Sequence, residues 1–166
     1  MKKFLLIVLS MTILVVPSFA DGKINRTLKD KVGIGFNTTY YRVPALACRY
    51  WLTDAVGVEG FTGFSIRKRY NTYIVGLKLL RIIKSYKSLN LLASTTLELH
   101  EAENSRAPYT RFNFLAGVGI EWFVLDNLSL STEIGFKFET GSANVTNFST
   151  DVNTITIPVV NVKFYL

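Results

Sequence analysis

The chain has 166 residues, a formal net charge of +7 and a hydrophobic content of 49%. Its single cysteine excludes an internal disulfide, and no spacing of cysteine and histidine residues suggests a metal site. After the first twenty residues no segment approaches 18 uninterrupted apolar residues, which excludes a helical membrane protein. We therefore predict one domain with no metal and no cofactor.

The first twenty residues have the pattern of a secretory signal peptide. Lys2 and Lys3 precede an apolar run over residues 4–16, and Ser18-Phe19-Ala20 forms a small-x-small cleavage site. An uncleaved anchor helix is the alternative, but the run is shorter than the roughly 20 residues that a span needs. We expect cleavage after Ala20. The mature domain, residues 21–166, then has a charge of +5, because two lysines and no acidic residue are removed.

The rest of the chain alternates between apolar and polar or small residues with a period of two, as strands with one apolar face do. Eight such segments follow one another, at residues 31–39, 45–53, 56–66, 70–83, 89–100, 111–124, 128–140 and 155–166. Strands of about 9–13 residues are long for a soluble sheet and suit a tilted crossing of a bilayer. Backbone groups in lipid must all be paired, which requires closure. The pattern predicts an all-β fold, an eight-stranded antiparallel up-and-down transmembrane β-barrel.

Two segments fit this pattern poorly. Pro158 lies inside the last segment and cannot donate a ladder hydrogen bond, which predicts a bulge there or a strand that pairs only from Val159 onward. The alternation is lost over Leu79–Ile83, so the end of the fourth strand is open to within a few residues.

The links between strands predict an orientation. With the N-terminus in the periplasm, the short links at residues 54–55, 84–88 and 126–127 are periplasmic turns. The links at residues 40–44, 67–69, 101–108 and 141–153 then face outward, and the last two are long and polar, as surface loops are.

Aromatic residues agree with this orientation and predict two girdles at the membrane interfaces. The outer girdle consists of Tyr40, Phe64, Tyr73, Phe112 and Phe138, and the inner one of Tyr50, Trp122 and Phe164. The alternative is that aromatic residues simply favour strands.

Several of these features together resemble a known family. The signal peptide, the eight segments, the terminal V-x-V-x-F-x-L pattern and the segment RYWLTDAVGVEGFTGFS (residues 49–65) are similar to small outer-membrane barrels of the OmpA transmembrane-domain, OmpX and opacity-protein type. The resemblance implies the outer membrane of a Gram-negative-type bacterium, assembly by the barrel-assembly machinery, and a structural, adhesive or host-interaction role. In that family the last residue is usually phenylalanine. Here it is Leu166, with Phe164 two residues before it.

Ten charged residues fall on the inward rows of the predicted strands. They are Arg49, Glu59, Lys78, Glu98, Arg111, Glu121, Glu133, Lys137, Glu139 and Lys163. Eight strands enclose a lumen only wide enough for side chains, and buried charges must be paired. We therefore predict a salt-bridged plug without a continuous pore, with a narrow porin-like channel as the alternative.

A lipid A-modifying enzyme is the second alternative. Ser94, Glu98 and His100 share one face of a strand, in the residue types of a nucleophile, an orienting acid and a base. Ser94 and His100 are six residues apart, which is about 20 Å along a strand at 3.3 Å per residue, too far for direct proton transfer. The His-x-Ser motif that the deacylase type has is missing. We predict no enzyme and no catalytic residue.

A basic triplet, Arg67-Lys68-Arg69, falls at the predicted outer rim, where lipopolysaccharide phosphates lie; the alternative is a solvated turn. Nothing resembles a nucleic-acid-binding motif. We predict a monomer that acts through the links at residues 101–108 and 141–153. Its predicted partners are outer-membrane lipid, lipopolysaccharide and a host or surface ligand.

Overall fold

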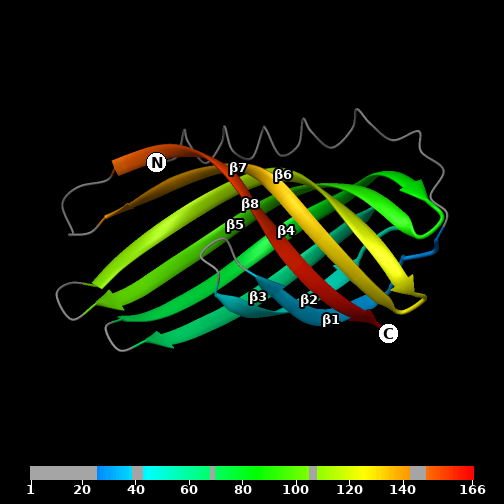
Figure 1. Ribbon diagram of the computed structural model, residues 1–166, viewed down its shortest axis with the longest axis horizontal. Coiled ribbons are helices and arrows are strands. Elements are labelled where there is room, and N and C mark those ends of the chain that lie inside the picture. Colours follow the sequence, from blue (N-terminus) through cyan, green and yellow to red (C-terminus); the bar gives the residue numbers. More distant parts are fainter. Residues whose placement is uncertain (1–25, 39–42, 68–69, 105–107, 143–148) are drawn as a thin grey trace.

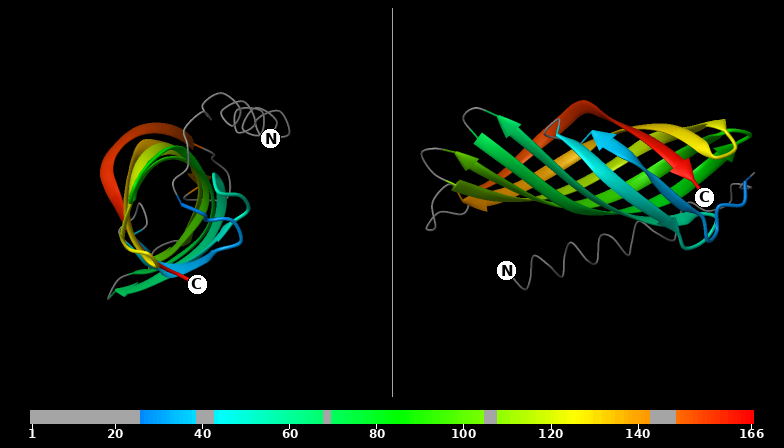
Figure 2. Two further views of the ribbon diagram at one scale, coloured as in Figure 1. Left: turned by 90° about the vertical axis from the view of Figure 1, so that its right-hand side faces the viewer. Right: turned by 90° about the horizontal axis from the view of Figure 1, so that it is seen from below.

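The computed structural model describes residues 26–38, 43–67, 70–104, 108–142 and 149–166, which form a closed barrel (Figure 1). Its strands are β1 (Val32–Thr38), β2 (Pro44–Trp51), β3 (Val56–Arg67), β4 (Tyr70–Tyr86), β5 (Leu89–Asn104), β6 (Pro108–Leu125), β7 (Leu128–Ser142) and β8 (Ser149–Tyr165). Consecutive strands pair antiparallel, and β8 pairs with β1 to close the ring, as the end-on view of Figure 2 shows. The predicted eight-stranded up-and-down barrel is confirmed. Among the described residues no helix is long and apolar enough to span a membrane.

Side chains alternate between the outside of the barrel and its lumen. In β2, Leu46 and Tyr50 are exposed on the outside, whereas Ala47, Arg49 and Trp51 are buried in the lumen. The same alternation holds at the C-terminus, where Val160, Val162 and Phe164 lie outside. Asn161, Lys163 and Tyr165 lie inside. The period of two therefore sorts the sequence into an apolar outer surface and a polar interior.

The outer surface is an apolar band to which every strand contributes. Its most exposed members include Ile34, Phe36, Leu46, Phe64, Ile66, Tyr73, Val75, Leu77, Leu97, Leu99, Phe112, Val118, Ile120, Trp122, Ile134, Phe136, Val160, Val162 and Phe164. On the outward rows of the described strands, charged residues occur only near strand ends, at Arg81, Lys84, Glu101 and Glu103. A continuous apolar belt of this extent is stable where lipid covers it.

One end of the barrel, here called the turn end, carries the tight turns and the C-terminus. The predicted turn at residues 126–127 is confirmed by the ends of β6 and β7. The predicted turn at residues 84–88 is wrong, because β4 continues to Tyr86 and only Lys87 and Ser88 form the turn. The reason is a bulge between Ile82 and Lys84, which restores the alternation that the sequence had lost.

The opposite end, here called the loop end, differs from the prediction more strongly. The predicted loops at residues 101–108 and 141–153 are wrong, because β5 extends to Asn104, β6 begins at Pro108, β7 ends at Ser142 and β8 begins at Ser149. Polar sequence there does not end the strands, since the backbone ladder continues through pairs such as Glu103 with Pro108. The links at residues 39–42, 68–69, 105–107 and 143–148 lie outside the described residues.

Pro158 sits in a bulge, as predicted. Glu133 pairs with Val159 and Gly135 pairs with Ile155, so residues 156–158 lie opposite Ile134 alone. The bulge removes the need for a ladder hydrogen bond from the proline nitrogen.

The barrel wall is shorter on the side formed by β1 and β2 than on the opposite side. β1 and β2 have 7 and 8 residues, whereas β4 and β8 have 17 each. Within the described residues, β8 pairs with β1 only over Asn161–Tyr165, and β2 pairs with β3 only up to Gly63. The two short strands therefore end before their neighbours do, since β8 begins at Ser149 and β3 continues to Arg67 (Figures 1 and 2).

Glycines in the lumen make room for aromatic rings on the neighbouring strand. Gly57 lies opposite Trp51 in the β2–β3 ladder, and a Cβ atom at Gly57 would lie 2.9 Å from Cε3 of the indole. Gly33 stands in the same relation to Tyr165, where a Cβ atom would lie 2.6 Å from the ring. Each ring thus occupies space that a side chain at the glycine would fill.

We expect Gly57→Val to destabilise the barrel by about 1–3 kcal/mol, because the added side chain overlaps Trp51 in a filled lumen. Gly60→Val, on the outward row of the same strand, is the control, since nothing lies within 4 Å of a Cβ atom there. Urea unfolding in lipid vesicles measures both. Equal stability of the two variants would contradict the packing described here.

Candidate functional site: the filled lumen

The ten charged residues predicted for the lumen all lie on inward rows. Eight of them are buried: Arg49, Glu59, Lys78, Glu98, Glu121, Glu133, Lys137 and Lys163. The side chains of Arg111 and Glu139, close to the loop end, are 41% and 13% exposed. The structure brings most of these residues into two clusters, one around Arg49 and one around Glu139.

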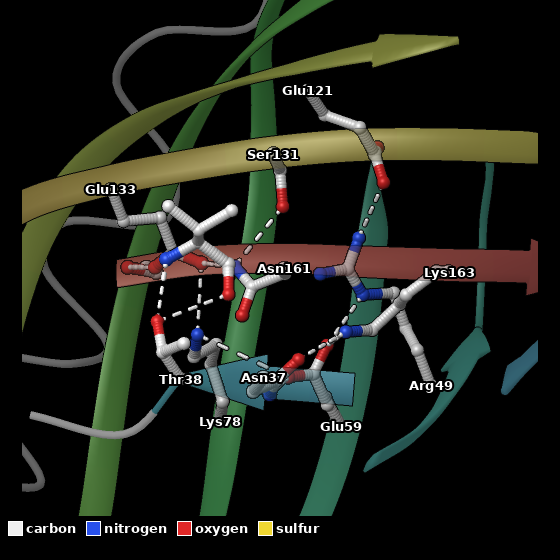
Figure 3. Close-up of polar contacts among 12 residues, drawn as sticks. Asn37, Thr38, Arg49, Glu59, Lys78, Glu121, Ser131, Glu133, Asn161 and Lys163 are labelled. Atoms are coloured by element: carbon white, nitrogen blue, oxygen red, sulfur yellow. Dashed lines mark hydrogen bonds and ion pairs between the residues drawn. The ribbon is translucent and has the colours of Figure 1, made fainter. Parts of the chain in front are cut away.

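Arg49 lies in the middle of the lumen between Glu59 and Glu121, and these three residues are here called the waist (Figure 3). Its Nε donates to Glu59 Oε2 at 2.7 Å, and its Nη1 crosses the lumen to Glu121 Oε1 at 2.8 Å. The Tyr165 hydroxyl donates to the same Glu121 oxygen at 2.9 Å, as does the Ser129 hydroxyl. The planar guanidinium, with donors in several directions, suits this position between two carboxylates.

Glu59 links the waist to the next layer. It accepts a hydrogen bond from Asn37 Nδ2 at 2.6 Å, and Lys163 Nζ lies 3.1 Å from its Oε2. Lys163 also donates to Asn37 Oδ1 at 2.7 Å. Glu59 therefore binds groups from β1, β2 and β8, and it faces Lys78 directly across the β3–β4 ladder.

Lys78 and Glu133 form the layer nearer the loop end. Lys78 Nζ donates to Glu133 Oε1 at 2.8 Å and lies 3.9 Å from Glu59 Oε1. The other oxygen of Glu133 accepts from Ser94 Oγ at 2.7 Å, and Asn161 Nδ2 donates to Glu133 Oε1 at 3.2 Å. Both carboxylate oxygens of Glu133 are thus satisfied.

These contacts make a neutral network that includes all eight strands. Three cations, Arg49, Lys78 and Lys163, balance three anions, Glu59, Glu121 and Glu133. The contributing strands are β1 through Asn37, β5 through Ser94 and the others through the residues above. A network of this kind fixes the relative position of the strands, since each missing partner leaves a charge buried without compensation.

The second cluster lies toward the loop end. Arg111 Nη1 contacts Glu139 Oε1 at 2.6 Å, and Lys137 Nζ also contacts Glu139. The ring of His100 packs edge-on against Tyr109, with 5.7 Å between centroids.

The turn end of the lumen is closed by an apolar cluster that the sequence analysis missed. It consists of Leu28, Trp51, Leu80, Ile82, Leu92, Phe123 and Tyr165. The loss of apolar–polar alternation over Leu79–Ile83 was the signal for this cluster, since the inward residues Leu80 and Ile82 are apolar there. Trp51 connects this cluster to the waist, because the Arg49 guanidinium lies 5.7 Å from its ring centroid.

Leu28 reaches this cluster from a strap formed by residues 26–31, which crosses the turn end. Asp54 Oδ1 accepts hydrogen bonds from the backbone N–H groups of Leu28 at 2.7 Å and Lys29 at 2.9 Å. Arg26 donates to the carbonyl of Asp126 at 2.7 Å and stacks over Phe123 at 4.3 Å. The backbone hydrogen bonds from Lys29 and Leu28 lower the pKa of Asp54.

The structure does not assemble Ser94, Glu98 and His100 into a catalytic relay. The Ser94 hydroxyl donates to Glu133, and Glu98 accepts a hydrogen bond from Asn113 at 3.1 Å. A nucleophile needs its base within hydrogen-bond reach, and neither contact involves the histidine.

The other predicted residues lie on the outside or beyond the described residues. Seven of the interface aromatics are exposed on the outer surface: Tyr50, Phe64, Tyr73, Phe112, Trp122, Phe138 and Phe164. Tyr40 and the pair Lys68 and Arg69 of the basic triplet lie outside the described residues, and Arg67 is the last residue of β3. Residues 1–20, the predicted signal peptide, also lie outside them.

We expect Arg49→Met to destabilise the barrel by about 3–5 kcal/mol, because Glu59 and Glu121 lose the cation between them. Arg111→Met, which breaks a partly exposed ion pair, is the control and should cost at most about 1 kcal/mol. Urea unfolding in lipid vesicles compares the two. If Arg49→Met lowered the free energy of unfolding no more than Arg111→Met does, the result would contradict a stabilising role of the network around Arg49.

The strap should detach at low pH. The pKa of Asp54 is lower in the folded chain than in the unfolded chain. The stabilisation of the strap by Asp54 is therefore fully present above the ordinary aspartate pKa of about 3.9, and it is lost as the pH falls through the pKa of Asp54 in the folded chain. Amide hydrogen exchange at Leu28, corrected for its intrinsic pH dependence, should therefore accelerate in acid. Asp54→Asn should remove this pH dependence. Asp30→Asn should preserve this pH dependence, since Asp30 accepts a hydrogen bond from the Tyr50 hydroxyl and none from Leu28. A pH dependence of exchange that Asp54→Asn leaves unchanged would contradict the role of Asp54 in holding the strap.

Two solved outer-membrane barrel structures are similar to this chain. No protein-family model and no curated protein sequence matches the chain. The N-terminal β-barrel domain of Pseudomonas aeruginosa OprF matches with a TM-score of 0.54 and 15% identity, over 85% of this chain and 100% of that domain. Neisserial surface protein A (NspA) matches with a TM-score of 0.44 and 10% identity, over 81% and 89% of the two chains. The chain shares the barrel fold of the OprF domain, which confirms the predicted resemblance to small outer-membrane barrels at the level of the fold.

Proposed function

We propose that this chain is an outer-membrane protein whose closed barrel serves as a structural or surface-interaction scaffold. The observation that carries the proposal is the apolar band around the barrel, in which the charged residues of the described outward rows, Arg81, Lys84, Glu101 and Glu103, lie near strand ends. Exposing such a belt to water costs free energy, whereas burying it in the hydrocarbon core of a bilayer does not. The fold likeness to the OprF domain supports the same conclusion.

The filled lumen favours a scaffold over a channel. An ion that crosses the barrel would have to separate Arg49 from Glu59 and Glu121 and then pass the apolar cluster at the turn end. Both barriers lie in series along one narrow lumen. The geometry therefore supports the plug over the porin-like alternative, and the separated Ser94 and His100 give no support to lipid A chemistry.

The surface role rests on the strands that extend beyond the short β1 and β2. In the proposed orientation the loop end faces outward, and the ladders between β4 and β8 carry the chain away from the membrane. Adhesin-like contacts would then involve the strand ends together with the links between them. Arg67, the last residue of β3, begins the basic triplet, whose residue types suit contact with lipopolysaccharide phosphates.

We expect the refolded wild-type protein to insert into planar bilayers without stepwise conductance, because the waist and the apolar cluster close the lumen. A heat-modifiable shift in the gel mobility of the same refolded protein is the control for barrel formation. Regular single-channel steps would favour the porin-like alternative. A protein that stays soluble without detergent would contradict the membrane proposal itself.

A further inference from the structure

Two cations interrupt the apolar band on β4, and a bulge brings them together. The register skips Ile83, and Lys84 pairs with Leu91 on β5. Without the extra residue Lys84 would face the lumen, because successive side chains of a strand point to opposite sides. Arg81, which pairs with Ala93, and Lys84 therefore take consecutive outward positions of the ladder, about 7 Å apart along the strand.

The pair lies at the turn end of the barrel wall. Arg81 pairs with Val56, the first residue of β3, so β4 continues past β3 toward its turn with β5. Lys84 Nζ lies 4.9 Å from the ring centroid of Tyr86, the last residue of β4, and Tyr86 is exposed on the outside. Aromatic rings of this kind mark the level of the lipid headgroups. In the orientation predicted from the links, this level belongs to the periplasmic leaflet.

No acid neutralises this pair. Among the described residues neither cation forms an ion pair within 4.0 Å, and Arg81 Nε is buried without a hydrogen-bond partner. Asp54, in the neighbouring turn between β2 and β3, directs its Oδ1 to backbone N–H groups of the strap. Glu101, an outward acid of β5, lies at the loop end. The turn end of β4 thus carries uncompensated positive charge beside apolar surface.

The chemistry of the pair fits a phosphodiester. A guanidinium and an ammonium group both donate charge-assisted hydrogen bonds to phosphate oxygens, and their long side chains can converge on one phosphate. A zwitterionic headgroup suits the pair less well, because its ammonium group would approach two cations with no acid beside them. Toward the loop end the same strand presents Leu77 and Val75, which are exposed on the outside and can pack against acyl chains.

We propose that Arg81 and Lys84 form a binding site for an anionic phospholipid of the phosphatidylglycerol type. Both side chains donate hydrogen bonds to its phosphate, and its acyl chains lie along the outward apolar residues of β4. The proposal rests on the outer-membrane role proposed above and adds a lipid preference at one place on the barrel surface.

Fluorescence quenching by brominated lipids tests the site, with Trp122 as the reporter. Trp122 pairs with Leu89, and Leu89 pairs with Tyr86, so the Cα atoms of Trp122 and Tyr86 are about 10 Å apart across two strand spacings. The mature chain with Trp51→Phe is refolded into vesicles of equimolar phosphatidylglycerol and phosphatidylethanolamine, in which one lipid or the other has brominated chains. We expect phosphatidylglycerol to be preferred near Trp122 by about threefold or more.

Substitutions at the site and a second reporter position supply the controls. Arg81→Gln and Lys84→Gln should each lower the preference, whereas Lys29→Gln, which removes a cation from the strap, should retain it. In the chain with Trp51→Phe, Trp122→Phe and Phe164→Trp, the reporter lies at the turn end on β8, across the ring from β4. This reporter should detect no preference, because it is far from the proposed site.

Three results would each overturn the proposed site: equal quenching by the two brominated lipids at Trp122, a preference that Arg81→Gln and Lys84→Gln leave unchanged, or an equal preference at the Phe164→Trp reporter. The first comparison needs no substitution at Arg81 or Lys84, so it stands even if those variants do not fold. Absence of quenching by either lipid would instead contradict the membrane location on which the site depends.

Discussion

The narrow lumen of an eight-stranded barrel is the constraint on which the rest of this structure depends. The interior is wide enough for side chains and too narrow for bulk water, so each inward polar group needs a partner within the barrel. Arg49 meets this demand at the waist, where it holds Glu59 and Glu121 from opposite sides of the lumen. The balanced charges around it are a consequence of the same demand.

The lumen changes character along its length. Apolar residues fill the turn end, ion pairs fill the middle, and an open cavity lies toward the loop end. Glycines such as Gly57 and Gly33 permit the first of these layers, because aromatic rings lie over them. Thr38, at the end of the short β1, is among the residues that line the cavity.

The sequence predicted the architecture well, because one physical rule controls it. Lipid on one side and a polar lumen on the other impose a period of two, so strand number and facing could both be derived. The missing N–H of Pro158 left two outcomes open, a bulge or pairing from Val159 onward, and the structure has the bulge. Strand ends were predicted less well. The residues near Asn104 and Ser149 are polar, and a polar sequence outside the membrane is compatible with either a loop or a continued ladder.

The contents of the lumen could be predicted only in part. Inward charges follow from alternation, but their partners depend on the register and on contacts across the barrel, such as that between Arg49 and Glu121. Tyr165 was on the inward row beside Lys163 and could have been included. Leu28 could not, since it precedes the strands and reaches the lumen through a strap that Asp54 and Arg26 hold across the turn end.

The two tryptophans of the chain allow the most direct test of the account, since Trp122 is 49% exposed on the outer band and Trp51 is 0% exposed in the lumen. The measurement is fluorescence quenching by brominated lipids in vesicles that contain Trp51→Phe or Trp122→Phe. We expect strong quenching in Trp51→Phe, which retains Trp122 against the lipid. We expect little quenching in Trp122→Phe, which retains Trp51 in the lumen. Equal quenching of both variants, or the reverse order, would contradict an apolar surface in lipid around a closed lumen.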